Sequence, residues 1–314
     1  MADRGPGEIV GVSECAERLR SFVQETARDA HPVTLVGEPG TGKELAARLI
    51  HEGSSRRKGP FLMIDCSLYY ERELKRELFG SQNGPDDARG KKGLLEFAGK
   101  GTCYLSRIEE LTPGLQAGLL RFLASGRFRR LGDGKEISSN VRIVVSSDRN
   151  LKSLVDAGLF DAPLYERLSE HAFRLSPLRE RAVDIPVLVD WAIRKAAARH
   201  GRSRPLAVHP DALEALQAYP WPRNFDEILA ELERLLRARR TEVGVEQLSP
   251  EISGYWLGRK CDPRLRRALE ELDACIAEFK VFSKLEADLG EDAAAIADWL
   301  DSEEAAESGP ADGW

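Results

Sequence analysis

A glycine-rich segment between a short strand-like run and a helix-like run constrains this chain more than any other feature. Residues 37–44 read Gly-Glu-Pro-Gly-Thr-Gly-Lys-Glu and supply the glycines and the lysine of a phosphate-binding loop. Residues 33–36 are apolar and β-branched, and residues 44–50 have helical spacing. In such a loop the backbone N–H groups turn inward and the helix N-terminus adds positive charge. A glycine turn without a ligand is the alternative, and the matching context on both sides argues against it.

Composition predicts a globular protein of a reducing compartment. The 314 residues suggest about two domains, and 42% hydrophobic with 31% charged residues is ordinary for a chain with a buried core. No apolar run approaches the ~18 residues of a membrane span, and the N-terminus lacks a signal-peptide core. The net charge of -6 argues against a dedicated nucleic-acid surface. The cysteines are scattered and lack the spacing of metal ligands; they are Cys15, Cys66, Cys103, Cys261 and Cys275. We therefore expect reduced structural thiols, no metal site and a cytoplasmic location.

Up to about residue 175, strand-like and helical patterns alternate. The predicted strands cover residues 33–36, 61–64, 102–105 and 142–146, and helical patterns between them include residues 71–79 and 115–123. This alternation predicts an α/β domain built on a parallel sheet with right-handed connections. Beyond residue 185 the strand signals stop, and helices are predicted at residues 187–199, 210–219 and 224–239. A small all-α second domain follows from that pattern.

The last part of the chain has a different character. An apolar stripe with helical spacing runs through Leu265, Leu269, Leu272, Ile276 and Phe279. It fits a helix packed on its own domain better than a partner-binding coil, because it spans few heptads. From residue 286 onward the sequence is acidic and lacks Lys and Arg, which predicts a solvated tail. The predicted division is 1–176, 177–250, 251–289 and 290–314.

Many linked segments carry recognisable motifs, in a consistent order and spacing. They are residues 9–11, 37–45, 50–51, 59–61, 77–80, 115–121, 164–168, 177–181, 184–186 and 219–222. With these segments the chain resembles the AAA+ central domain of bacterial sigma-54-dependent transcription activators. The resemblance implies a P-loop AAA+ parallel sheet flanked by helices and followed by a helical lid. It also implies ring oligomers that hydrolyse ATP at subunit interfaces.

The resemblance implies ATP or ADP as the bound cofactor. Lys43 would reach the terminal phosphates, and a Glu after that lysine is normal in the family, so Glu44 is no defect. The implied nucleotide contacts are Val10, Gly11, Gly37, Glu38, Pro39, Gly40, Thr41, Gly42, Lys43, Glu44 and Leu45. Of two arginines at the family's subunit interface, the second is kept as Arg167 and could serve a neighbouring subunit as an arginine finger.

Two segments depart from the family where its chemistry resides. The family's sigma-54-contacting loop Gly-Ala-Phe-Thr-Gly-Ala becomes Gly-Pro-Asp-Asp-Ala-Arg at residues 84–89, so direct contact with sigma-54 is not expected. The family's Asp-Glu after the third strand becomes Ser106 and Arg107. That Asp organises magnesium and that Glu polarises the attacking water. A positioned base alone contributes about 10²–10⁴-fold, so we expect turnover near background, no Mg²⁺ role and no catalytic residue of the chain's own.

Other positions are exchanged for acids. The family's switch Asn aligns with Asp65, its sensor Asn with Asp148, its lid sensor Arg with Asp226 and its first interface Arg with Asp161. Asp65 and Arg107 have reversed but complementary polarity, which predicts a salt bridge that locks the switch. Two other possibilities stay open at this point. Arg107 could replace the metal's charge beside the phosphates, or it could point to solvent at a decayed site.

Three functions remain open on the sequence. The favoured one is a nucleotide-binding regulatory subunit that assembles with itself or with AAA+ activator subunits. The second is a slow ATPase that uses Glu109 or Glu110, although acids beyond a strand end are commonly surface residues. The third is an interaction scaffold with the loop kept only for folding. Residues 255–314 lack a helix-turn-helix pattern and end in an acidic tail, so direct DNA binding is not expected; no membrane association is expected either.

Overall fold

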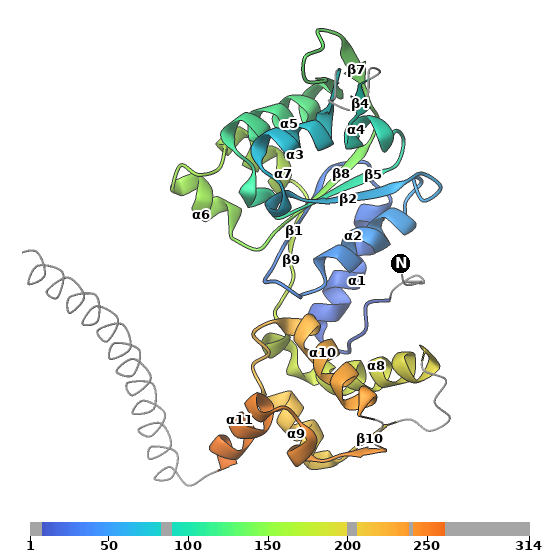
Figure 1. The fold of residues 1–314 in the computed structure, drawn as a ribbon, viewed down its shortest axis with the longest axis vertical. Helices are drawn as coiled ribbons and strands as arrows, with labels where there is room; N and C mark the ends of the chain where they lie inside the picture. The colour runs from blue at the N-terminus through green and yellow to red at the C-terminus, as the bar shows by residue number, and fades with distance from the viewer. Residues whose placement is uncertain (1–7, 83–89, 200–205, 239–240, 261–314) are drawn as a thin grey trace, which may run out of the picture. The chain divides into compact units, whose positions relative to one another are not determined.

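A five-stranded parallel sheet forms the centre of the computed structural model, which describes residues 8–82, 90–199, 206–238 and 241–260. Its strands lie in the order β2-β5-β8-β1-β9 (Figure 1). Their bounds are β1 (Val33–Val36), β2 (Phe61–Asp65), β5 (Thr102–Ser106), β8 (Arg142–Ser147) and β9 (Ala172–Arg174). The predicted α/β fold is confirmed, and four of these strands lie where the sequence predicts them. The fifth, β9, was not predicted.

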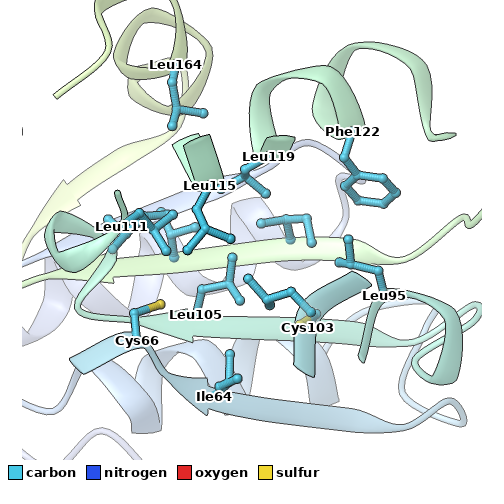
Figure 2. Packing of buried hydrophobic residues seen from close by; sticks show 14 of the residues in the cluster. Ile64, Cys66, Leu95, Cys103, Leu105, Leu111, Leu115, Leu119, Phe122 and Leu164 are labelled. Carbon is cyan, nitrogen blue, oxygen red and sulfur yellow. The ribbon is translucent and has the colours of Figure 1, made fainter. Parts of the chain in front are cut away.

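Helices cover both faces of this sheet (Figure 1). One face carries α3 (Glu71–Phe79), α4 (Leu94–Phe97), α5 (Pro113–Ser125), α6 (Leu151–Asp156) and α7 (Ala162–Ser169). The other carries α1 (Glu14–Ala27) and α2 (Lys43–Glu52). Alternate residues of β5 supply the two cores. Cys103 and Leu105 pack under α5 on the first face (Figure 2), and Tyr104 packs with α1 and α2 on the second.

Two of the predicted structural thiols lie deep in the first core. Cys66 and Cys103 are buried and free, and burial raises the pKa of each thiol to about 12. A thiol whose pKa is raised by burial stays protonated at neutral pH and is a poor nucleophile. Both residues therefore act as small apolar side chains, as expected.

The lid follows the sheet and is mostly helical. It contains η3 (Leu178–Asp184), α8 (Ile185–Arg199), α9 (Pro210–Ala218), α10 (Asn224–Arg237) and η4 (Val245–Gln247). The three α-helices lie at their predicted positions. A parallel pair of two-residue strands, β10 (Ala207–Val208) and β11 (Glu242–Val243), joins them, so the prediction that this domain contains only helices is wrong in this detail. Trp221 is fully buried beside these helices and donates its indole N–H to Leu216 O at 2.8 Å.

Smaller elements complete the first domain. Two hairpins pair β3 (Gly80–Ser81) with β4 (Lys91–Lys92) and β6 (Arg127–Arg129) with β7 (Glu136–Ser138). Single 3₁₀ turns, η1 (Cys66–Leu68) and η2 (Ile108–Glu110), follow the ends of β2 and β5. They set the direction of the chain at the edge of the sheet where the strands end. That edge carries the candidate site.

The chain divides into two compact units between Ser249 and Pro250. Both the sheet and the lid belong to the first unit, and α11 (Pro250–Lys260) begins the second. Residues 84–89, the apolar stripe at 265–279 and the acidic tail lie outside the described residues, so the predictions made for them stay predictions. In the described part of the chain, no helix is both long enough and apolar enough to cross a membrane.

Candidate nucleotide-binding site

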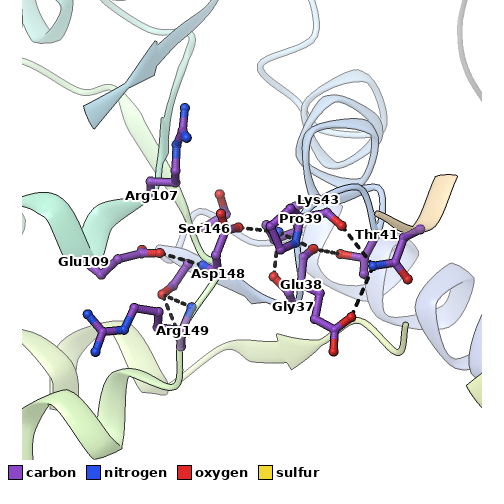
Figure 3. Close-up of polar contacts among 12 residues, drawn as sticks. Gly37, Glu38, Pro39, Thr41, Lys43, Arg107, Glu109, Ser146, Asp148 and Arg149 are labelled. Carbon is purple, nitrogen blue, oxygen red and sulfur yellow. Dashed lines mark hydrogen bonds and ion pairs between the residues drawn. The ribbon is translucent and has the colours of Figure 1, made fainter. Parts of the chain in front are cut away.

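The glycine-rich loop joins β1 to α2 at the carboxyl edge of the sheet. Helix α2 starts at Lys43, and Gly42 before it has a φ of 98° and provides no side-chain cap. The first N–H groups of a helix lack intrahelical partners and carry its partial positive charge, so this end suits an anion. Lys43 Nζ donates to the carbonyls of Gly37 at 2.6 Å and Glu38 at 2.8 Å (Figure 3). The ammonium group is therefore held inside the loop.

Asp148 at the end of β8 lies directly against this lysine. Its Oδ1 is 2.7 Å from Lys43 Nζ, and both side chains are largely buried. The Asp148 N–H donates in turn to Glu109 Oε1 at 2.8 Å (Figure 3). A carboxylate at this position competes with phosphate oxygens for the same ammonium group.

Glu109 is not the surface residue that its place after the strand suggested. Its side chain is half-buried, and Oε2 has no hydrogen-bond partner among the described residues. Glu110, beside it, is exposed as expected. Because η2 turns the chain back toward the end of β8, two carboxylates, Glu109 and Asp148, lie together near Lys43.

The predicted salt bridge between Asp65 and Arg107 is confirmed. Arg107 Nε donates to Asp65 Oδ1 at 2.8 Å and Nη2 donates to Asp65 Oδ2, which makes a bidentate pair. Asp65 faces Ser106 in the parallel register, so the pair closes the ends of β2 and β5. In Figure 3 the Arg107 side chain points away from the loop. Its guanidinium contacts the Asp65 carboxylate and is not surrounded by solvent alone. The possibility that Arg107 points freely to solvent is wrong here; whether it reaches bound phosphates stays untested.

Two features show that this pair is held in place. Burial raises the pKa of the Asp65 carboxyl, but hydrogen bonds from Arg107 and from the N–H and hydroxyl of Ser67 outweigh it and leave the pKa below its usual value. Arg107 itself has left-handed backbone angles, φ 54° and ψ 54°, which cost a non-glycine residue about 1 kcal/mol. Such strain persists only where surrounding contacts over-determine the conformation.

A double-mutant cycle on this pair is expected to give a coupling free energy of about 1 kcal/mol at pH 7. The value stays modest because both side chains are partly exposed. The pKa of Asp65 is lower in the folded than in the unfolded state. The contribution of its charge to the free energy of unfolding is therefore complete above the unfolded-state pKa and disappears as the pH falls through the folded-state pKa. Urea unfolding of Asp65→Ala, Arg107→Ala and the double variant measures it. If the effects of the two substitutions on the free energy of unfolding are strictly additive at pH 7, the salt bridge contributes no coupling free energy to the fold.

The lid holds the loop from the other side. Asn224 Nδ2 donates to Pro39 O at 2.9 Å, and Phe225 N donates to Gly40 O at the same distance. Gly40 has a φ of 74°, and a Cβ there would lie 2.2 Å from Arg223 O, so only glycine fits this contact. Glu38 forms a bidentate ion pair with Arg179. The start of α10 and the loop therefore form one hydrogen-bonded unit.

A cavity of about 440 Å³ lies beside the loop, between α1, α2 and the lid helices. This volume falls in the usual range for small-ligand sites. Its apolar wall includes Val10, Leu188, Trp191, Phe225 and Leu229. Residues 40–42 of the loop also line it, and so does the acid Asp226, which aligns with the family's lid arginine. An apolar slot continuous with a phosphate nest fits the base and the phosphates of a nucleotide.

A buried arginine is directed to the same cavity. Arg181 is 4% exposed, donates to Thr41 O at 3.2 Å and lies 4.7 Å from the centre of the Phe225 ring. Its Nε has no hydrogen-bond partner among the described residues, and burial lowers the pKa of its guanidinium. An unsatisfied buried donor at a cavity wall is the kind of group that a bound ligand completes.

Asp184 positions the N-terminal segment that lines one side of the cavity. This fully buried carboxylate accepts from Val12 N at 2.6 Å and from Ser13 N and Ser13 Oγ, both at 2.7 Å. Gly11 packs against it with a φ of 151°, and a Cβ there would lie 2.7 Å from Asp184 Oδ2. Val10 and Gly11 are thus positioned by the lid rather than by the sheet.

Most of the predicted contact residues come together at this site. The cavity is lined by Val10, Gly40, Thr41, Gly42, Glu44 and Leu45, while Gly37, Glu38, Pro39 and Lys43 form the loop beside it. Sequence reasoning missed Arg179, Arg181, Asp184 and Asn224. Arg179 and Arg181 belong to the matching stretch 177–181 and Asp184 to the stretch 184–186, and these stretches were the available signal. Asn224 lies at the start of α10, two residues after the matching stretch 219–222.

The interface positions lie away from the loop. Asp161 caps α7 by accepting from Leu164 N at 2.8 Å, so it serves the local fold. Arg167, the predicted arginine finger, is partly exposed at the end of α7 and pairs with Glu170 at 2.9 Å. An ion pair of this kind near the surface is weak, so the arginine can leave Glu170 at low cost.

The chain matches known protein families over most of the described region. A family model described as the sigma-54 interaction domain matches residues 9–174, and one described as the AAA+ ATPase lid domain matches residues 179–255. The Nif-specific regulatory protein of Azotobacter vinelandii is 39% identical over 72% of this chain and 43% of its own length. The anaerobic nitric oxide reductase transcription regulator NorR of Aeromonas salmonicida is 37% identical over 76% and 48%. The chain thus spans less than half the length of these relatives.

Solved structures agree with the sequence matches. NtrX from Brucella abortus in complex with ADP superposes with a TM-score of 0.73 at 33% identity, covering 78% of this chain and 55% of that chain. The same protein in complex with ATP gives 0.72 at 32% identity, covering 88% and 63%. Direct contact with sigma-54 is typical of the matched family, so the comparisons give no support to the expectation that this chain avoids it. The chain belongs to the AAA+ sigma-54 interaction domain family of bacterial transcription regulators.

Proposed function

We propose that this chain is a nucleotide-binding regulatory subunit that holds ATP or ADP and hydrolyses ATP at no more than a background rate. It would act on transcription through partner proteins, assembling with itself or with hydrolysing AAA+ subunits. Partly exposed Arg167 is the group it would offer to a neighbour's nucleotide. The NtrX complexes with ATP and ADP support nucleotide binding by this fold.

The single observation that carries the proposal is the state of the β5 edge. Ser106 has no carboxylate to organise a metal ion, and Arg107, in the place of a general base, is bound to Asp65. A guanidinium is never deprotonated at physiological pH and accepts no proton, so it cannot activate water. The loop and the cavity beside it support nucleotide binding, whereas Ser106 and Arg107 supply neither of the family's two catalytic carboxylates.

One observation favours a second candidate, a slow ATPase. Glu109 holds one carboxylate oxygen on Asp148 N and buries the other without a partner among the described residues. A buried, poorly satisfied carboxylate can act as a base. Under this alternative, Glu109→Gln would abolish a measurable hydrolysis rate that Arg107→Ala leaves intact.

The proposal is tested by incubating the purified full chain with labelled ATP, removing free nucleotide and identifying what stays bound. We expect intact ATP on the natural chain and no retained label on Lys43→Ala. Lys58→Ala is the matched control, because that lysine lies outside the loop. If ADP is recovered and its recovery depends on Lys43, the chain is a slow ATPase and the proposal is wrong. If no nucleotide stays bound, the chain is an interaction scaffold that does not use the loop for binding.

Asp148→Asn is expected to tighten ATP binding by about tenfold. The substitution removes a carboxylate that lies 2.7 Å from Lys43 Nζ and would repel the incoming phosphates, and tenfold corresponds to about 1.4 kcal/mol. Isothermal titration of the two proteins with ATP measures the change. Asp156→Asn, an exposed acid, should leave affinity unchanged. Weaker binding in Asp148→Asn, specifically when Mg²⁺ is present, would show instead that Asp148 ligates the metal.

A further inference from the structure

A group of metal-ligating side chains lies outside the nucleotide site, where β1 and β9 begin. Asp29 and His31 come from the turn between α1 and β1, and His171 immediately precedes β9. One ligand atom from each lies within 4.8 Å of the other two. His31 Nε2 is 3.5 Å from Asp29 Oδ1, and His171 Nε2 is 3.7 Å from Asp29 Oδ2. The two imidazole rings lie 5.1 Å apart, centre to centre.

These distances are close to those of a tetrahedral metal centre. With metal–ligand bonds of ~2.1 Å, neighbouring ligand atoms of a tetrahedron lie about 3.4 Å apart. The two histidine–carboxylate separations, 3.5 Å to Oδ1 and 3.7 Å to Oδ2, exceed that edge only slightly, so each carboxylate oxygen lies near ligand distance from one imidazole. Two imidazoles and one carboxylate, with solvent at the remaining position, are a ligand set suited to Zn²⁺ and similar divalent transition metals rather than to Mg²⁺ or Ca²⁺. All three side chains are partly exposed, so an ion can reach them.

The backbone that carries the three ligands is fixed by contacts unrelated to them. Thr34 N donates to His171 O at 2.9 Å, which ties the start of β9 to β1. Buried Arg142 donates to Thr26 O at 2.6 Å and to His31 O at 3.2 Å, which holds the turn after α1. Asp29 accepts from His31 N at 3.0 Å. Ligands on a fixed backbone lose less conformational freedom when they bind an ion.

The ligand types of the cluster also suit a cation, because each oxygen of the Asp29 carboxylate faces one of the two imidazoles. A simple salt bridge needs a protonated imidazole, whereas a divalent cation engages two neutral imidazoles and the carboxylate together. The charge of Arg142 also attracts Asp29, which moderates the affinity for an ion.

We propose that Asp29, His31 and His171 form a divalent transition-metal site that fastens edge strand β9 to the turn before β1. The site is independent of nucleotide binding, because its residues belong neither to the loop nor to the cavity beside it. It would make the position of β9, which leads into the lid through residues 175–177, depend on metal.

The test titrates the metal-free full chain, without nucleotide, with Zn²⁺ and with Co²⁺ in separate experiments. We expect one saturable site, a rise in melting temperature on Zn²⁺ addition, and a Co²⁺ spectrum without thiolate charge-transfer bands. His171→Gln and Asp29→Asn should each weaken binding by at least about tenfold. His209→Gln is the matched control, since that histidine pairs with Glu242 elsewhere in the lid.

Several results would overturn the proposal. These are no saturable binding, a thiolate-type Co²⁺ spectrum, or equal binding by the natural chain, His171→Gln and Asp29→Asn. Circular dichroism and the melting temperature of the metal-free variants identify any that fail to fold. His31→Gln, on the turn rather than beside the strand, then provides the same test from a second ligand.

Discussion

Replacing Asp184 by alanine is expected to lower the free energy of unfolding by about 3 kcal/mol. The carboxylate is fully buried and accepts three hydrogen bonds, two from the N–H groups of Val12 and Ser13 and one from the Ser13 hydroxyl. Hydrogen bonds to a charged group are worth ~1.5–3 kcal/mol each but do not add fully, and alanine leaves the donors buried and unsatisfied. Urea unfolding, with the midpoint and slope fitted together, measures the change.

The same substitution reaches the nucleotide site through the chain it holds. Because Asp184 fixes the segment that carries Val10 and Gly11, its loss should also weaken ATP binding. Asp184→Asn keeps one carbonyl acceptor and should lose about half as much stability. Asp156→Ala is the control, an exposed acid paired with Lys152 whose loss should cost under about 1 kcal/mol. Equal losses in Asp184→Ala and Asp156→Ala would show that Asp184 fastens nothing.

The sequence predicted the parts of the fold that have a strong local pattern. Strands β1, β2, β5 and β8 are four to six residues long and rich in apolar or β-branched side chains, so their period is visible. Strand β9 has three residues, and β10 and β11 have two each. A pattern of two or three residues has no period to recognise, and these strands exist because long-range pairing partners are already in place.

The contacts of the site also divide into those that the sequence predicted and those that it did not. The Asp65–Arg107 pair was predictable because two positions that align with the family's switch Asn and catalytic Glu are exchanged for residues of complementary charge. The Lys43–Asp148 contact depends on side-chain directions at the start of α2 and just after β8, which sequence does not encode. The inward turn of Glu109 depends on a single 3₁₀ turn. The Asp29, His31 and His171 cluster exists only because the unpredicted strand β9 pairs with β1.

Restoring three side chains at the ends of β2 and β5 is expected to raise ATP hydrolysis by at least about 10²-fold. The variant combines Ser106→Asp, Arg107→Glu and Asp65→Asn. The first supplies a metal-organising carboxylate and the second a base, and each effect alone is worth orders of magnitude. The third is needed because Asp65 now pairs with Arg107, and beside Glu at position 107 its charge would be repelled. Steady-state phosphate release by the natural and triple variants, at equal saturation with Mg²⁺-ATP, measures the gain.

The design separates loss of chemistry from loss of binding. A double variant that retains Asp65 should gain far less than the triple variant, because two carboxylates side by side raise each other's pKa and misplace the base. Adding Lys43→Ala to the triple variant should abolish the gain, which assigns the activity to this loop. A further Asp148→Asn exchange should increase turnover if that carboxylate opposes the phosphates. If the triple variant binds ATP but turns over no faster than the natural chain, then the β5 edge is not what limits hydrolysis, and the acids at Asp161 and Asp226 become the positions to exchange.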